Sequence, residues 1–381
     1  MKRLILISLL LVQACGLIDI DKPENKALIA DRNLQRLARM FAELPLETAH
    51  LQEVHDAVEA SSGQGYDDEY TMDCLLTDPG SGIGTHKTRS AAPREFSYTN
   101  PIRNLIREYY QQHPVTKASV EEMMEQLAAS GYQLYWPYSE NWDGKTFPII
   151  TFDPGYGAES NYGYAISYKE DGTRVIDSVY VDELVASKRP VWVLNSNSDS
   201  GFSPVDLFST ALPSRSVIKE SSEGRIRTLR MKSFKMLRNY DSWFGGASEF
   251  ICRCGSVEGF TASTDAELKL YSPSVTDFMI VVKRKYVGVE LPLDAILVSD
   301  FRRQLDKLAF IVTEDDGGTQ TSWKCQAVVK IQSKSYGFEV DIPYNDKDDI
   351  VWRGQLAARL FEQEDTVTGR FGDVEITFEL D

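Results

Sequence analysis

The stretch Val374-Glu375-Ile376-Thr377-Phe378-Glu379-Leu380 decides the fold of the C-terminal part of this chain. Its apolar residues alternate with Glu and Thr, and the stretch Phe338-Glu339-Val340-Asp341-Ile342 follows the same pattern. Successive side chains of a strand point to opposite faces of a sheet. The alternation therefore predicts strands with one buried face and one solvated face.

Other segments after residue 225 are also typical of strands. We expect them near 226–237, 247–254, 277–287, 307–313 and 324–332. In the first segment, Leu229 and Met231 give way to Phe234 and Met236, and this change of phase predicts a bulge near Ser233. The stretch from Asp294 to Leu305 instead fits a helix. Seven or more short strands in about 155 residues predict an antiparallel β-sandwich over residues 225–381.

Residues 96–200 have the pattern of a small α/β domain. Asn100 followed by Pro101 predicts the start of one helix, and Ser119 with Glu122 has the capping-box spacing that starts another. Strands are expected near 132–136, 147–152, 162–168, 174–181 and 190–194. A linker rich in Ser, Asp and Pro is expected over residues 196–224.

Residues 26–95 are predicted to be a helical segment followed by a flexible loop. The apolar stripe from Leu34 to Phe41 predicts a helix that ends at Pro45, and a second helix is expected near 46–59. Residues 61–95 show no period and favour a flexible connection. The predicted fold class is α+β, with N-terminal helices and a small α/β domain followed by a C-terminal antiparallel β-sandwich.

The N-terminus has the layout of a secretory signal peptide. Lys2 and Arg3 precede an apolar run from Leu4 to Val12, and the small residue Ala14 precedes Cys15. The segment Leu11-Val12-Gln13-Ala14-Cys15 resembles a bacterial lipobox. This resemblance implies that residues 1–14 are removed, that Cys15 carries a lipid, and that residues 15–25 form a tether to the membrane.

The charge of the chain argues against nucleic-acid partners. It has 41 Lys and Arg against 57 Asp and Glu, and a net charge of −16. Binding to a phosphate backbone requires clustered basic residues, so we expect no nucleic-acid partner. Attachment to the membrane is therefore expected to depend on the lipid alone.

Four cysteines remain besides Cys15. Cys252 and Cys254 are two residues apart on a predicted strand and should share a face with Phe250, and Cys325 lies on another strand. Free cysteine packs as a small hydrophobe, which favours buried thiols. A bridge from Cys325 to Cys252 or Cys254 is the alternative.

Three loops of the predicted sandwich are acidic. They are Asn239 to Phe250, Glu314 to Gly318, and Asn345 to Asp349. This arrangement resembles a C2-type sandwich, which has an Asp between its first strands and an Asp-rich loop after an alternating strand. The resemblance implies a Ca²⁺ site with ligands at Asp241, Asp346, Asp348 and Asp349, since Ca²⁺ takes six to eight oxygens from flexible loops. The other interpretation is a set of solvated turns, where Asp and Asn are common.

Aromatic residues are concentrated between residues 132 and 168. Among them, Tyr135, Trp136, Tyr138 and Trp142 lie close to turn residues, and Asn and Asp are interleaved with them. Flat apolar faces beside polar groups are typical of a groove that binds a glycan or peptide. The alternative is that these rings form the core of the small domain.

The sequence offers little for nucleophilic catalysis. It has four histidines and no Gly-x-Ser-x-Gly elbow, and His50 and His55 are five residues apart, unlike two ligands on one helical face. A carboxylate pair drawn from Glu140, Asp143 and Asp153 would be the basis for hydrolysis.

The whole chain resembles the uncharacterised lipoproteins of Gram-negative cell envelopes, on the basis of its signal, its acidity and its layout of helices and strands. We therefore expect a lipid-anchored protein of the cell envelope, at the outer membrane. Its predicted function is that of a non-catalytic binding module with an aromatic surface and a Ca²⁺ site. The alternative function is an envelope hydrolase that acts on glycan or peptide through a carboxylate pair.

Overall fold

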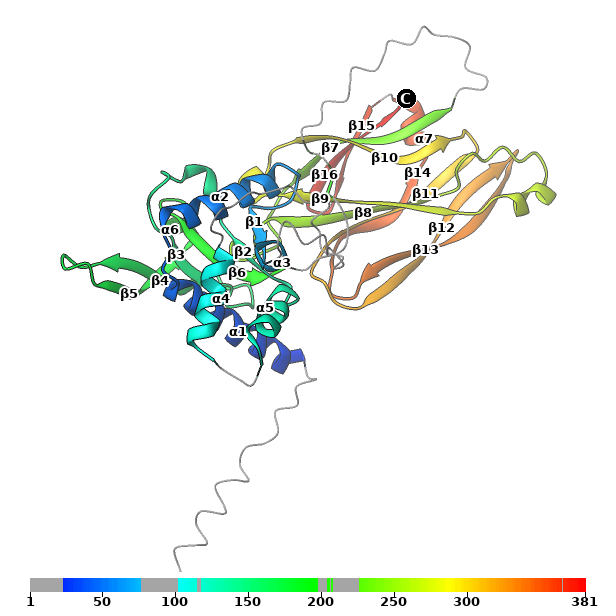
Figure 1. Ribbon diagram of the computed structural model, residues 1–381. Coiled ribbons are helices and arrows are strands. Elements are labelled where there is room, and N and C mark those ends of the chain that lie inside the picture. Colours follow the sequence, from blue (N-terminus) through cyan, green and yellow to red (C-terminus); the bar gives the residue numbers. More distant parts are fainter. Residues whose placement is uncertain are drawn as a thin grey trace, which may run out of the picture.

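The computed structural model describes residues 23–76, 102–114, 118–197, 204–205, 207, 226–364 and 366–381, with the backbone alone for 23–31. The predicted signal peptide, Cys15 and the first part of the tether lie outside the described residues, as do most of the 61–95 connection and of the 196–224 linker. Figure 1 shows a domain of helices and one sheet beside a second domain built mainly of strands. No helix in the described part of the chain is long and apolar enough to cross a membrane.

The first domain is built on a six-stranded sheet with the strand order β1-β2-β6-β3-β4-β5. Neighbouring strands are antiparallel except β3 and β6, which are parallel. The five strands predicted between residues 132 and 194 are confirmed as β2 to β6. The strands are β1 (Glu69–Thr71), β2 (Tyr132–Tyr135), β3 (Ile149–Phe152), β4 (Ser160–Tyr168), β5 (Arg174–Asp182) and β6 (Val191–Ser196). The helices are α1 (Pro23–Glu43), α2 (Thr48–Ser62), α3 (Met72–Leu76), α4 (Ile102–Gln112), α5 (Val120–Ala128) and α6 (Glu183–Ala186), with a 3-10 turn η1 (Ser139–Asn141).

The N-terminal helices share a core with this sheet. Leu37 and Phe41 of α1 belong to the same buried cluster as Trp192 and Leu194 of β6. Residues 26–76 and 102–197 therefore form one domain, in which helices cover one face of the sheet. The flexible connection predicted over 61–95 is wrong for residues 69–76, because β1 pairs with β2 and α3 buries Met72, Leu75 and Leu76.

Two polar contacts set helix ends in this domain. The predicted capping box is confirmed, because the Ser119 amide donates to Glu122 Oε2 at 2.7 Å and the Glu122 amide donates to Ser119 Oγ at 3.2 Å. At the C-terminal end of α1, the Arg174 guanidinium donates to the carbonyl oxygens of Ala42, Glu43 and Leu44. These carbonyls have no partner within the helix, and a cation beside them also suits the helix dipole. Arg174 thereby fastens β5 to the end of α1.

The second domain is the predicted antiparallel β-sandwich. One sheet has the order β10-β7-β16-β15, and the other has the order β13-β12-β11-β8-β9 with β14 also paired to β11. The inner faces of both sheets contribute to one hydrophobic core that includes Phe234, Phe310 and Phe378. The strands are β7 (Arg227–Met236), β8 (Ser248–Ser256), β9 (Ser274–Val282), β10 (Leu291–Phe301), β11 (Leu305–Glu314), β12 (Gln320–Ile331), β13 (Lys334–Asn345), β14 (Asp349–Ala357), β15 (Thr366–Phe371) and β16 (Val374–Leu380). The short helical pieces are η2 (Asp265–Leu270), η3 (Arg284–Tyr286) and α7 (Arg359–Gln363).

Details of the sandwich confirm some predictions and correct another. The bulge near Ser233 is confirmed, since Thr377 pairs with Ser233 whereas the next residue, Phe378, pairs with Met231. The helix predicted over 294–305 is wrong, because residues 291–301 form β10 and pair with β7. Its Leu and Ala residues favour a helix locally, but Leu293, Ala295 and Leu297 alternate into the core and the pairing with β7 prevails.

The cysteines of the sandwich are buried or partly buried thiols. Cys252 and Cys254 are fully buried beside Phe250 in the sandwich core, as predicted. Cys325 packs at the edge of the same core, and among the described cysteines all four are free. Burial raises the pKa of Cys325 to about 11, which disfavours the reactive thiolate. The interpretation as packed thiols holds, and the bridge from Cys325 is absent from the described structure.

The two domains meet through the loop that joins β7 to β8. Val191 and Val193 of β6 face away from the helices, and Trp243 and Phe244 of this loop are buried against them. Trp243 Nε1 donates to the carbonyl oxygen of Glu159 at 3.0 Å. The sheet of the first domain is thus covered by its own helices on one face and by a loop of the sandwich on the other.

Substitution of Trp243 by Ala should test this joint. Loss of the buried ring is expected to lower the free energy of unfolding by about 3–5 kcal/mol, and to separate the unfolding of the two domains into distinct transitions. Chemical denaturation followed by circular dichroism measures both effects. Tyr156→Ala is the matched control, since Tyr156 is 84% exposed and its loss should change little. Equal stability of the two variants would show that the loop does not join the domains.

Candidate functional site

Three consecutive basic residues clamp the sandwich to the first domain. Lys283 pairs with Asp68, Arg284 with Glu183 at 3.1 Å, and Lys285 with Glu140. Burial alone would raise the pKa of Glu140 and of Glu183, but the Lys285 and Arg284 side chains lower both pKa values. Both carboxyl groups are therefore held in the charged form, as a clamp between domains requires.

A small cleft lies between these ion pairs. It is lined by Asp68, Tyr135, Pro137, Tyr138, Glu140, Glu183, Trp243, Lys283, Arg284 and Lys285. Its volume is about 20 Å³, which is room for one or two water molecules. In this arrangement the cleft is too small for a sugar ring or a peptide side chain.

The predicted aromatic surface is not the exposed surface of the domain. Trp136 is fully buried, so its prediction as a ligand-binding surface residue is wrong, and Tyr135 is only 5% exposed. Tyr138 is half-buried, and its hydroxyl donates to Glu183 at 3.0 Å. Trp142 is half-buried, and its Nε1 donates to the carbonyl oxygen of Thr146. The reason is that both faces of β2 are covered, one by helices and the other by Trp243 and Phe244.

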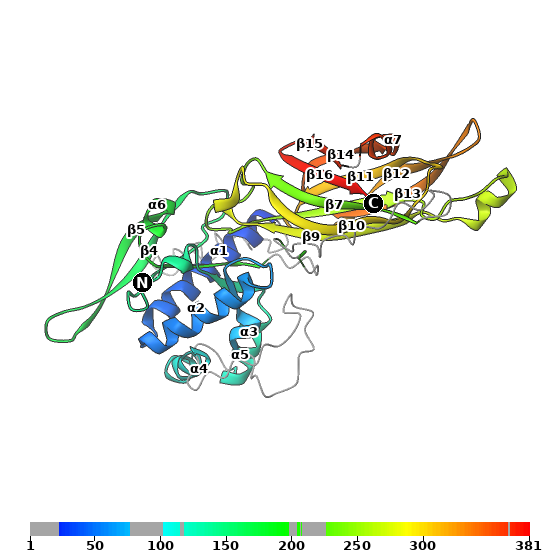
Figure 2. The same cartoon turned by 90° about the horizontal axis from the view of Figure 1, so that it is seen from above.

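The exposed aromatic residues of the described first domain lie instead on β4, on β5 and in the turn before β4. They are Tyr156, Tyr162, Tyr168 and Tyr180, which are between 52% and 84% exposed. Tyr162 and Tyr180 pair across the two strands, with ring centroids 6.3 Å apart. Figures 1 and 2 show that the β4–β5 hairpin points away from the sandwich. The alternation of Tyr162, Tyr164 and Tyr168 in the sequence was the available signal, but it does not show which tyrosines are covered by a helix.

The acidic loops come together at the end of the sandwich that meets the first domain. The last residue of β11, Glu314, pairs in register with both Asp349 of β14 and Phe250 of β8. The side chains of Asp241 and Glu314 share a hydrogen bond. Asp316 interacts electrostatically with Asp349, Asp348 and Asp315. We call the group formed by Asp241, Glu249, Glu314, Asp315, Asp316, Asp348 and Asp349 the acidic cluster.

Crowding of these carboxyl groups changes their protonation. Burial is the largest cause that raises the pKa of both Asp241 and Glu314. Neighbouring charges raise both further, those of Asp316 and Glu249 at Asp241 and those of Asp241 and Asp316 at Glu314, whereas the hydrogen bond with Glu314 lowers the pKa of Asp241. Burial and neighbouring charges also raise the pKa of Asp316 to about 6. Within the described residues, Arg253 is the buried basic group beside the cluster, and it interacts with Asp348 and Asp315. The acidic cluster thus favours a bound proton or cation.

Three of the four predicted Ca²⁺ ligands lie near one another, each interacting electrostatically with Asp316. Asp241, Asp348 and Asp349 belong to the acidic cluster, and Asp348 is 7% exposed with its Oδ2 accepting from the Asn345 amide. Asp346 is exposed and accepts a hydrogen bond from the Thr319 amide at 2.7 Å, in the adjoining turn. Glu314 and Asp316 were not among the predicted ligands, although their acidic run is visible in the sequence. The register of β11 against β14, in which Glu314 lies opposite Asp349, places Glu314 and Asp316 in the acidic cluster.

Comparison with known proteins adds no relative to this geometry. The chain matches no protein-family model, no curated protein and no solved structure.

The chemistry available to the acidic cluster is that of hard oxygen ligands. Among the described residues, no three carboxylates of the cluster have oxygens within 4.8 Å of one another, so a cation that accepts many oxygens at variable geometry, as Ca²⁺ does, would have to draw the loops closer together. Asp316 and Asp349 are exposed, whereas Glu314 and Asp348 are buried, so the cluster extends from solvent to the interior. A cation could therefore enter from solvent and reach the buried members.

Substitution of Asp241 by Asn should reveal the repulsion in this cluster. The folded state holds a proton on Asp241 at pH values where the unfolded state, with a pKa near 3.8, has lost it. The free energy of unfolding of the wild-type protein should therefore fall as pH rises above about 4. In EDTA, the Asn variant should become more stable than wild type by about 1–2 kcal/mol between pH 5 and pH 8.

Denaturation curves at several pH values measure this difference. Asp341→Asn is the matched control, because Asp341 is exposed on β13 outside the cluster. A difference between wild type and Asp241→Asn that is constant with pH, or that matches the Asp341→Asn control, would contradict the predicted protonation.

Proposed function

We propose that this protein is a lipid-anchored, non-catalytic binding module of the cell envelope whose acidic cluster binds Ca²⁺. The observation that supports it is the group of carboxyl side chains from three loops, in which burial first, and then the charges of neighbouring acids, raise the pKa of Asp241, Glu314 and Asp316. Carboxyl groups held this way cost stability unless a proton or a cation neutralises them. Ca²⁺ at an exposed group of oxygens is the simplest such cation outside the cytoplasm.

The ligands would come from the three loops of the cluster. Asp316 and Asp349 would supply the carboxylates that solvent reaches, Asp241 would supply a more buried one, and Glu314 would exchange its proton for the ion. Asp346, predicted as a ligand from the resemblance to C2-type sandwiches, is proposed to hold the neighbouring turn through Thr319 instead.

Binding of Ca²⁺ would act on the joint between the domains. Asp241 lies two residues before Trp243, and its carbonyl oxygen accepts a hydrogen bond from Arg284 at 2.7 Å. An ion that fixes Asp241 would therefore also fix the loop that covers the sheet of the first domain. In this proposal Ca²⁺ makes the two domains one rigid body.

The binding surface that we propose is the exposed tyrosine face of the β4–β5 hairpin. Tyr162 and Tyr180 offer paired rings to solvent, with Tyr156 and Tyr168 nearby on the same hairpin and its entry turn. Exposed rings suit stacking on the apolar faces of a glycan or on peptide side chains. This surface replaces the one predicted around Trp136 and Trp142.

The alternative function remains an envelope hydrolase with a carboxylate pair. Asp143 is a poor member of such a pair, because hydrogen bonds from Thr146 and Lys145 lower its pKa to about 2. Glu140 is paired with Lys285. Asp241 and Glu314 are the two carboxyl groups that share a hydrogen bond, as an acid–base pair would, but Glu314 is only 1% exposed.

Ca²⁺ should raise the melting temperature of the full chain. At millimolar Ca²⁺ we expect a rise of roughly 3–5 °C, because the ion binds the folded state preferentially. The variants Asp316→Asn and Asp349→Asn should lose most of this rise, and both side chains are exposed enough for the variants to fold. Differential scanning calorimetry in Ca²⁺ and in EDTA measures the shift.

The matched control for these variants is Asp341→Asn, which makes the same chemical change on the solvated face of β13 and should keep the full shift. Mg²⁺ should stabilise less, since it demands a smaller and more regular shell of ligands. If millimolar Ca²⁺ does not change the melting temperature of the wild-type protein, the acidic loops are solvated turns and not a Ca²⁺ site.

The lipid anchor has a separate test. Cys15→Ser should block lipid attachment and removal of residues 1–14, because the lipid is carried on the cysteine thiol. The variant should leave the membrane fraction and migrate as the unprocessed chain. Cys74→Ser is the control and should be processed as wild type. A Cys15→Ser chain that still partitions with membranes in full would refute the anchor.

A further inference from the structure

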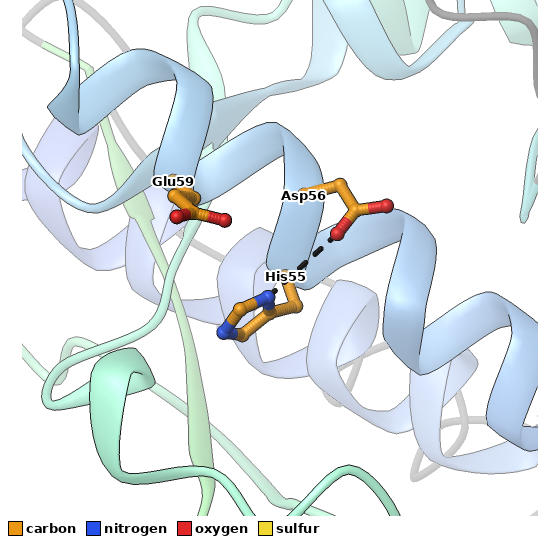
Figure 3. Close-up of side chains that lie close together, drawn as sticks. All are labelled: His55, Asp56 and Glu59. Atoms are coloured by element: carbon orange, nitrogen blue, oxygen red, sulfur yellow. Dashed lines mark ion pairs between the residues drawn. The ribbon is translucent and has the colours of Figure 1, made fainter.

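We infer that helix α2 carries a second cation site, formed by His55, Asp56 and Glu59 and suited to a divalent transition metal such as Zn²⁺. One ligand atom from each of the three side chains lies within 4.8 Å of the others. Figure 3 shows the Asp56 and Glu59 carboxylates on either side of the His55 imidazole. This site is on the first domain and is independent of the acidic cluster.

The helix itself brings the three side chains together. Positions 55 and 59 are one turn apart and lie on one face, and position 56 is the next residue around the helix. All three side chains therefore fall within about 100° of the helix circumference. The spacing of His50 and His55 does not suit two metal ligands, and the carboxylates beside His55 are what complete the set.

The imidazole is held in place before any metal binds. The His55 ring lies 5.8 Å from the Trp136 ring and 5.3 Å from the Trp142 ring, measured between centroids. Its Nδ1 atom is buried and makes no hydrogen bond within the described residues. The nearest carboxylate oxygen, Asp56 Oδ1, is 3.7 Å away. A buried nitrogen that faces a carboxylate without bonding to it leaves room for a shared cation.

The two carboxylates differ in how they are held. Gln52 Nε2 donates to Asp56 Oδ1 at 2.7 Å, which orients that carboxylate as an outer hydrogen bond does in metal sites. Glu59 is exposed and can change rotamer at little cost. Bonds of about 2 Å to the metal would draw the three ligand atoms closer together than they are without it. Movement of Glu59 and Asp56 toward the fixed imidazole would achieve this.

The donor set distinguishes this site from the acidic cluster. One imidazole nitrogen and two carboxylates suit Zn²⁺, Cu²⁺ or Ni²⁺, whereas Ca²⁺ prefers oxygen ligands alone. Three protein ligands would leave positions for water on the solvent side, where Asp56 is 43% exposed. The Trp142 ring borders the same site, so a metal there would lie beside an aromatic face.

Binding of Zn²⁺ to the full chain without a histidine tag tests this site. Calorimetric titration in excess Ca²⁺, which would occupy the acidic cluster, should show one equivalent of Zn²⁺ bound. His55→Ala and Glu59→Gln should each weaken binding by about tenfold or more. His113→Ala is the matched control, since His113 stacks on Tyr109 away from this cluster, and it should bind as wild type.

A second readout locates the metal. Cu²⁺ bound at His55 should quench the fluorescence of the adjacent Trp136 and Trp142, and Glu59→Gln should reduce the quenching without unfolding the domain, since Glu59 is exposed. Equal Zn²⁺ affinity in wild type and both variants, or the absence of any bound Zn²⁺ in wild type, would overturn the site. Loss of binding in His55→Ala alone, with Glu59→Gln unchanged, would also overturn the three-ligand arrangement.

Discussion

The packing of Trp243 and Phe244 against the sheet of the first domain is the constraint on which the rest of the structure depends. A sheet whose strands are apolar on both faces must be covered on both faces. Helix α1 and its neighbours cover one face, and the loop between β7 and β8 covers the other. Because the second cover comes from the sandwich, the small domain completes its burial only when the sandwich is docked on it.

The same loop couples packing to electrostatics. It runs from Leu237 to Ala247 and contains Asp241 just before the two buried rings, and the Ala247 amide donates to Asp67 at 2.9 Å. Asp67 is buried, and burial together with the neighbouring charge of Asp68 raises its pKa. The loop that joins the domains therefore lies between carboxyl groups of both domains. Acidic side chains of the two domains thus meet at the joint. Protons or a cation at this joint would decide how firmly the domains hold together.

Part of this arrangement can be predicted from the sequence. Features set by residues close in sequence are predictable, and features set by contacts between distant segments are not. Alternation identifies β13 and β16, and the phase change before Phe234 identifies the bulge, because these are local patterns. The prediction for β10 is wrong because its Leu and Ala content favours a helix locally, whereas the pairing with β7, which is distant in sequence, makes it a strand. The prediction that Trp136 is exposed fails because its neighbours in sequence are typical of turns, whereas the helices that bury its ring come from distant parts of the chain.

The candidate sites show the same division. The acidic runs are visible in the sequence, and their convergence follows from the order of the strands. The choice between Asp346 and Glu314 depends on a register that no local pattern contains. The set of His55, Asp56 and Glu59 follows from helical spacing, which puts the three positions on one side of α2, whereas the spacing between histidines alone does not reveal it.

The most direct test of the central proposal is a crystal structure of the full chain grown with millimolar Ca²⁺, with anomalous data to identify the ion. We expect an ion bound by oxygens of Asp241, Asp316 and Asp349, and a Glu314 side chain no longer hydrogen-bonded to Asp241. A structure in which the cluster is empty at saturating Ca²⁺, with the hydrogen bond between Asp241 and Glu314 intact, would contradict it.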